Sequence, residues 1–233
     1  MHVVMVPGYL LDRRLWNPVI HRLGSSADVS VPDLRPFDSV DAMAEHVLKH
    51  APPRFVLTGL SMGGYVGLTI MRRAPERVQA LALLNTQAGV DQPATLERRE
   101  KLRTLVESGG LEKAKESLKA LMLAPEHLAL GHPARTALDA MYADCDAGVF
   151  LRHQNALNRR RDNRDVLPTI NCPTLVLGSR QDALTPPAIQ QAMAEIIPSA
   201  RLVILEYSGH LSPLARPDAV AETFATWLSG LKS

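Results

Sequence analysis

The ten residues TGLSMGGYVG, numbered 58 to 67, hold a single serine, Ser61, between glycines at positions 59 and 63. The apolar residues Phe55-Val56-Leu57 come directly before this stretch, and a helix-like segment follows it as far as Pro75. Glycines two residues before and two residues after a serine remove the Cβ atoms that would collide in a sharp turn. The stretch therefore predicts a buried strand, a tight turn with a serine hydroxyl at its tip, and a helix.

A serine at this place can act as a nucleophile. The helix that starts after Ser61 would direct its free N–H groups and the positive end of its dipole towards a developing oxyanion. The N–H of Met62 is the best-placed donor. The alternative is a serine that only caps a helix in a glycine-rich turn, and the strand–turn–helix context favours catalysis.

A serine nucleophile needs a base, and the base needs a carboxylate that orients it. In this motif the expected order along the chain is serine, acid and histidine. Asp182 follows the apolar run 173–178, and His210 follows the run 201–206. The carboxyl ends of parallel strands meet at one edge of a sheet, so the three side chains are expected to converge there. Taken alone, Asp182 could be a turn or helix-cap residue and His210 a surface loop histidine.

Short apolar runs alternate with helical patterns over both ends of the chain. Strands are predicted at 2–6, 28–34, 55–60, 78–85, 173–178 and 201–206, and helices at 13–23, 38–50, 62–73, 187–196 and from Pro217 onwards. Continuous apolar strands separated by helices are typical of a parallel sheet that is covered on both faces.

Residues 88–168 break this alternation and contain no convincing strand. Their patterns predict four helices, at about 93–108, 111–123, 133–143 and 146–160. We therefore expect a helical cap, or lid, of residues 88–168 inserted into an α/β core formed by 1–87 and 169–233.

The second oxyanion donor is expected in the loop after the first strand, VPGYLLDRRLW. Pro7 has no N–H to donate. The backbone N–H of Tyr9 is the first choice and that of Leu10 the second.

The composition limits the other classes of function. With 46% hydrophobic and 21% charged residues the chain has the composition of a folded globular protein. Its net charge of +2, with no strongly basic block, argues against nucleic acid as the main partner. Cys145 and Cys172 form no CxxC pair and are expected to be reduced thiols. The sequence shows no signal-peptide pattern and no apolar run long enough to span a membrane, so we expect a cytoplasmic protein without a membrane partner.

These features resemble the α/β-hydrolase superfamily over most of the chain. The resemblance rests on the glycine loop at 7–16, the elbow GLSMGG, the acid turn GSRQD, and the GH pair that precedes a terminal amphipathic helix. Within the superfamily the chain looks like the small lidded carboxylic-ester hydrolases, a group that includes enol-lactonases, pimeloyl-ester esterases and arylesterases. The resemblance implies an α/β-hydrolase fold with a mostly parallel sheet.

The chain departs from the family pattern in three places. Pro7-Gly8 replaces the usual His-Gly, so a side-chain hydrogen bond that often braces the oxyanion loop is absent. The stretch PDLRPFDS, at 32–39, lacks the usual glycines, which implies a shorter pocket rim. The chain also begins at what resembles the third strand of the family sheet, so we expect about six strands and not eight.

Two further patterns could carry chemistry. His46 and His50 lie one helical turn apart, but a third zinc ligand is not evident and a solvated helix face is favoured. The run NRRRDNRD, at 158–165, is most simply a solvated surface. The sharper hypothesis is that Arg161 or Arg164 faces the pocket and holds a substrate carboxylate.

The sequence thus predicts a serine hydrolase of carboxylic esters or lactones, with no cofactor and no metal. A thioesterase, a C–C bond hydrolase and an acyltransferase would use the same three residues and remain open. A small-molecule receptor of the same fold is a further alternative, which three intact catalytic side chains disfavour. The oligomeric state is left open.

Overall fold

The computed structural model describes residues 1–231 of the chain. Its centre is a parallel sheet of six strands in the order β2-β1-β3-β4-β5-β6. The strands are β1 (His2–Val6), β2 (Asp28–Ser30), β3 (Phe55–Leu60), β4 (Val78–Leu84), β5 (Thr174–Ser179) and β6 (Ala200–Leu205). This arrangement confirms the predicted fold class and the predicted six strands.

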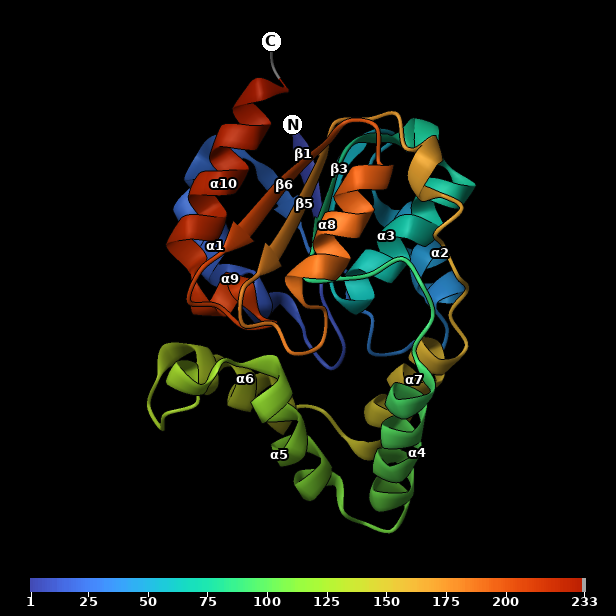
Figure 1. Cartoon of the computed structure of the whole chain (residues 1–233), viewed down its shortest axis with the longest axis vertical. Coiled ribbons are helices and arrows are strands. Elements are labelled where there is room, and N and C mark those ends of the chain that lie inside the picture. The colour runs from blue at the N-terminus through green and yellow to red at the C-terminus, as the bar shows by residue number, and fades with distance from the viewer. Residues whose placement is uncertain (232–233) are drawn as a thin grey trace.

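Helices cover both faces of the sheet (Figure 1). Helices α1 (Asn17–Leu23) and α10 (Pro217–Gly230) lie together on one face, with the short α9 (Ser212–Ala215) at their end. Helices α2 (Val40–His50), α3 (Met62–Arg73) and α8 (Pro187–Ile196) lie on the other. The three strands β3, β4 and β5 are buried along almost their whole length, as expected for a sheet covered on both sides.

The segment between β4 and β5 is helical. It contains α4 (Pro93–Glu107), α5 (Leu111–Met122), α6 (Pro133–Ala143) and α7 (Ala147–Asn158), each within two residues of its predicted bounds. Within the described part of the chain, no strand occurs between β4 and β5. These helices lie beyond the carboxyl ends of the strands, where the loops after β1, β3, β5 and β6 also emerge (Figure 1).

Two predicted elements differ from the structure. The strand expected at 28–34 ends at Ser30, and Pro32, which cannot donate a backbone hydrogen bond, lies just beyond. The helix expected at 13–23 is split into a 3₁₀ turn, Arg13–Leu15, and α1, because Pro18 suits the first turn of a new helix.

The strand order places the switch in chain direction between β1 and β3. The chain leaves β1 towards one edge of the sheet and leaves β3 towards the other. In open α/β sheets, ligands bind beyond the carboxyl ends of the strands at such a switch. The loop with Tyr9 follows β1 and the turn with Ser61 follows β3, so both lie at that point.

Candidate active site

Ser61 lies in the predicted turn between β3 and α3, with backbone angles φ 53° and ψ −114°. A positive φ is strained for a residue with a side chain, and such strain collects at functional sites. A Cβ on Gly59 would lie 2.2 Å from the carbonyl oxygen of Gly63. A Cβ on Gly63 would lie 2.3 Å from the carbonyl oxygen of Val6. Both positions therefore require glycine because the backbone itself fills the space.

The third glycine of the turn is explained by a residue that the sequence analysis did not single out. A Cβ on Gly64 would lie 2.3 Å from Oγ1 of Thr86, which follows β4. The Thr86 hydroxyl donates a hydrogen bond of 2.8 Å to the carbonyl oxygen of Ser61. Gly64 thus gives Thr86 the room to hold the serine turn from the neighbouring strand.

His210 and Asp182 are brought together in the interior. The Nδ1 atom of His210 lies 3.0 and 2.9 Å from the two carboxylate oxygens of Asp182, and both side chains are almost fully buried. Because a carboxylate only accepts hydrogen bonds, Nδ1 carries the hydrogen and Nε2 is the free base of the neutral ring. Among the described residues, that buried Nε2 atom has no hydrogen-bond partner.

Asp182 is held as a carboxylate. Its oxygens accept hydrogen bonds from the backbone N–H groups of Leu184 (2.9 Å) and Thr185 (3.0 Å) and from the Thr185 hydroxyl (2.7 Å). Burial opposes ionisation, but the attraction of His210 and these hydrogen bonds outweigh it and hold the pKa of Asp182 at about 2. The ionised side chain can orient the imidazole and stabilise its cation.

Asn85 completes this network, and sequence reasoning missed it. It follows β4, is fully buried and has a positive φ of 44°. Its Nδ2 atom donates to Asp182 (2.9 Å) and to Ser179 (3.0 Å), and its Oδ1 atom accepts from Ser212 (2.7 Å). A polar residue directly after a buried strand, on the edge where the other site residues lie, is the signal that could have identified it.

The two oxyanion candidates of the first loop differ. The N–H of Leu10 donates to Nδ1 of His153 over 3.2 Å and therefore already has an acceptor. Tyr9, which lines the same cavity as Ser61, remains the candidate of this loop. Met62 is the first residue of α3, and the first N–H groups of a helix have no acceptor within it.

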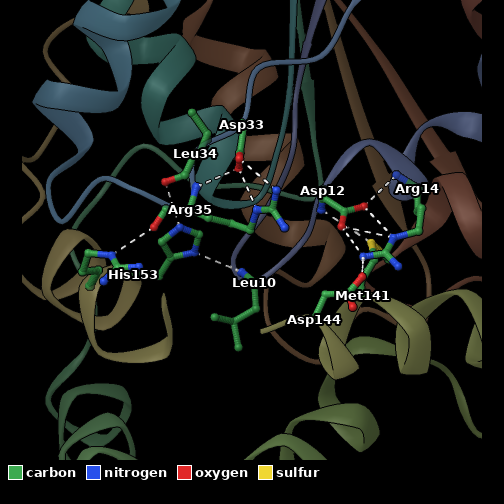
Figure 2. Close-up of polar contacts among 10 residues, drawn as sticks. Leu10, Asp12, Arg14, Asp33, Leu34, Arg35, Met141, Asp144 and His153 are labelled. Carbon is green, nitrogen blue, oxygen red and sulfur yellow. Dashed lines mark hydrogen bonds and ion pairs between the residues drawn. The ribbon is translucent and has the colours of Figure 1, made fainter. Parts of the chain in front are cut away.

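His153 braces this loop in place of the side-chain hydrogen bond that the usual His-Gly pair would make. It belongs to α7 and is fully buried, and its Nε2 atom donates to the carbonyl oxygen of Leu34 over 3.1 Å (Figure 2). Since the N–H of Leu10 can only donate, Nδ1 is the acceptor and the ring is neutral. Burial lowers the pKa of His153 to about 4, which keeps the ring in this form.

Further contacts join α6 and α7 to the loops after β1 and β2 (Figure 2). Arg14 pairs with Asp144 at 2.7 Å. It also donates to the carbonyl oxygen of Ala140. Arg152 donates to the carbonyl oxygen of Arg35 over 3.0 Å. The helical segment is thus tied to the loops after β1 and β2, the first of which is the candidate oxyanion loop.

Ser61 and His210 line one cavity of about 170 Å³. The helical segment contributes an aliphatic wall, formed by Leu102, Leu118, Leu121, Met122 and Leu157, and Leu184 and Ile189 add to it from the core. A polar part, formed by Gln87, Asp91, Gln92, Thr95, Arg98, Arg99 and Gln154, also lines the cavity. The aliphatic wall is thus only part of the lining.

The hypothesis that Arg161 or Arg164 faces this cavity is wrong. Both line a separate surface depression together with Arg72, and Arg164 pairs there with Asp162. The neighbouring Arg160 turns inward and pairs with Asp91.

The sequence also singled out two histidines and two cysteines outside the cavity. The ring centres of His46 and His50 lie 4.4 Å apart on α2, where His50 is exposed and His46 is partly buried against Phe37. Over residues 1–231, no group of three or more metal-binding side chains occurs. Cys145 and Cys172 are free thiols. No described helix is long and apolar enough to cross a membrane.

The chain is similar to known proteins in sequence and in fold. The model of the alpha/beta hydrolase family matches residues 3–223. The pimeloyl-[acyl-carrier protein] methyl ester esterase of Klebsiella pneumoniae is 27% identical over 252 residues, which cover 95% of this chain and 91% of the relative. The structure of a thermophilic esterase from Thermogutta terrifontis with malate bound has a TM-score of 0.91 and 29% identity, covering 100% of this chain and 91% of that one. The enol-lactonase of Burkholderia xenovorans LB400 shares the fold, with a TM-score of 0.87, 22% identity, and coverage of 98% and 91%.

Proposed function

Because the chain belongs to the alpha/beta hydrolase family and its relatives include esterases, we propose that it is a serine hydrolase that cleaves carboxylic esters or lactones through an acyl-enzyme. Ser61 is the nucleophile, His210 the general base and Asp182 the residue that orients it. One observation carries the proposal. The Nε2 atom of His210 has no hydrogen-bond partner in the described part of the chain, its ring is fixed by Asp182, and it lies at the cavity that Ser61 also lines.

The reaction follows from the positions of the protons. His210 Nε2 removes the hydroxyl proton of Ser61 as Oγ attacks the carbonyl carbon, and Asp182 stabilises the resulting imidazolium. The N–H groups of Tyr9 and Met62 donate to the oxyanion of the tetrahedral intermediate. The intermediate collapses, His210 gives its proton to the leaving alcohol oxygen, and the acyl group stays on Ser61. Water, deprotonated by His210, then releases the acid.

The aliphatic residues of the helical segment would select the acyl or alcohol group. We propose that residues 88–168 act as a lid over the core formed by 1–87 and 169–233, since they contribute much of the cavity lining. The cytoplasmic location expected from the sequence remains a prediction, which fractionation of the producing cell would test.

The test compares hydrolysis of p-nitrophenyl acetate, butyrate and octanoate by the wild type, by Ser61→Ala and by Ser108→Ala. Ser108 is an exposed serine at the end of α4 and serves as the matched control. We expect Ser61→Ala to lose on the order of 10⁴-fold or more in kcat, and Ser108→Ala to retain wild-type rates. Activity that survives in Ser61→Ala would refute the assignment, and thioester and diketone substrates measured alongside would separate the other reactions of the same residues.

A further inference from the structure

The polar part of the cavity has an unusual charge balance. Asp91 is the one carboxylate among the described residues that line the cavity, and its side chain is 4% exposed. It pairs with Arg160 and with Arg99. Two guanidinium groups thus share one buried carboxylate, and with Arg98 the side chains of this part of the cavity and their ion-pair partner carry a surplus of positive charge.

Arg160 is bound to the protein through both of its terminal nitrogens, while its buried Nε atom has no hydrogen-bond partner among the described residues. Besides its two contacts with Asp91, it donates to the carbonyl oxygens of Gly89 (3.0 Å) and Leu157 (2.9 Å), and it lies 4.3 Å from the centre of the Tyr65 ring. Its side chain is 3% exposed. Arg160 therefore balances the charge of Asp91 and is not directed at the cavity.

Arg99 and Arg98 are differently placed, since both line the cavity. Arg99 is 13% exposed, and its Nη1 atom contacts Asp91 and the side-chain oxygen of Asn158 at 3.3 Å. The half-buried Arg98 forms no ion pair and no side-chain hydrogen bond with any residue that the structure describes. The other polar residues of this part, such as Gln87, Gln92 and Thr95, are neutral. A cation kept away from water is costly unless an anion or hydrogen-bond acceptors compensate it.

We propose that the ester substrate carries a second, ionised carboxylate, which Arg98 and Arg99 bind while the ester carbonyl lies at Ser61. The substrate class is then the half-esters of dicarboxylic acids and lactones that bear an acid group. The planar guanidinium groups match a carboxylate in two-point geometry, and the leucines of the cavity cover the aliphatic chain between the two groups. This inference rests on the proposed hydrolase function.

Ester pairs that differ only in charge provide the test. We compare monomethyl with dimethyl esters of dicarboxylic acids from succinic to suberic, using the wild type, Arg98→Gln and Arg99→Gln. Arg161→Gln is the matched control, since Arg161 lies in a separate surface depression. Charge-assisted hydrogen bonds of this kind correspond to roughly ten- to a hundred-fold in affinity.

We expect the wild type to prefer the half-ester at its best chain length by about tenfold or more in kcat/KM. This preference should fall by a similar factor in Arg98→Gln and Arg99→Gln, mainly through KM, and persist in Arg161→Gln. Arg99 pairs with Asp91, whereas Arg98 forms no ion pair with a described residue, so Arg98→Gln keeps the test valid if Arg99→Gln does not fold. An equal rate on half-ester and diester, or an unchanged preference in the folded arginine variants, would overturn the inference.

The outcome also separates this inference from the proposed function. Diester hydrolysis that depends on Ser61 without any half-ester preference retains the hydrolase and refutes only the carboxylate site. No Ser61-dependent hydrolysis of either ester refutes both. In Ser61→Ala, the unhydrolysed half-ester should bind more tightly than the diester or inorganic phosphate, and tighter binding of phosphate would contradict the choice of a carboxylate.

Discussion

Replacing Asp182 by asparagine removes one negative charge and keeps the shape of the side chain. Each carboxylate oxygen accepts two hydrogen bonds besides its contact with His210, from backbone N–H groups on one side and from Thr185 and Asn85 on the other. An amide has only one oxygen, so its NH₂ group would face donors in either orientation. The variant should therefore lose both stability and activity.

The size of the stability loss follows from the pKa of Asp182. The difference between the ordinary pKa of 3.8 and the value of about 2 in the folded chain corresponds to about 2 kcal/mol of unfolding free energy. Since the pKa is lowered on folding, this contribution is complete above the unfolded pKa and is lost as the pH falls towards the folded one. The stability difference between wild type and Asp182→Asn should thus be largest near neutral pH and shrink below about pH 4.

Urea denaturation from about pH 7 to about pH 3 measures the stability difference between the wild type and Asp182→Asn. Ester hydrolysis at neutral pH measures the loss of kcat, which should be on the order of 10⁴-fold. Asp28→Asn is the control, because the Asp28 side chain is 81% exposed and lies at the opposite end of the strands. A stability difference that does not change with pH, or activity within about tenfold of the wild type, would refute the reasoning.

Three further substitutions test other parts of the site. Gly64→Ala places a Cβ against the Thr86 side chain and should lower the free energy of unfolding, measured by urea denaturation, by about 1–3 kcal/mol. Gly67→Ala in the same helix is the control, because the nearest atoms to its Cβ lie at 3.8 Å and it should not destabilise the fold. Asn85→Leu leaves its buried hydrogen-bond partners Ser179, Asp182 and Ser212 unsatisfied, and should lower both the free energy of unfolding, by about 1–3 kcal/mol, and kcat. An unchanged kcat would exclude a role of Asn85 in positioning Asp182. His153→Leu should lower kcat more than it raises KM, because it frees the oxyanion loop. The unfolded chain gains a proton at His153 near its ordinary pKa of 6.5, and the folded chain only near 4, so the wild type loses stability as the pH falls from 6.5 to 4. The variant has no imidazole at this position and should lose less stability over that range. Identical profiles of stability against pH would contradict this.

The sequence predicted the elements that depend on local pattern. The strand–turn–helix around Ser61 follows from glycine spacing and apolar runs, and the order of Ser61, Asp182 and His210 along a parallel sheet brings them to one edge. The helices between β4 and β5 could be located because their apolar periodicity and their Gly and Pro boundaries are local signals.

The contacts that the sequence did not predict join residues far apart in the chain. His153 braces Leu10 across 143 positions, and Asn85 contacts Asp182 across 97. No periodicity encodes such pairs. The arginine prediction failed for a related reason: α7 ends at Asn158, and beyond a helix end periodicity no longer fixes which of several neighbouring arginines turns inward.

The most direct test of the central claim is the site at which an active-site probe becomes attached. A fluorophosphonate reacts only with a serine that a neighbouring base activates, and peptide mass mapping then locates the phosphonyl group. We predict a single adduct per chain, on Ser61, that is absent in Ser61→Ala and in His210→Ala. An adduct on another residue, or labelling of Ser61 that persists without His210, would contradict the account.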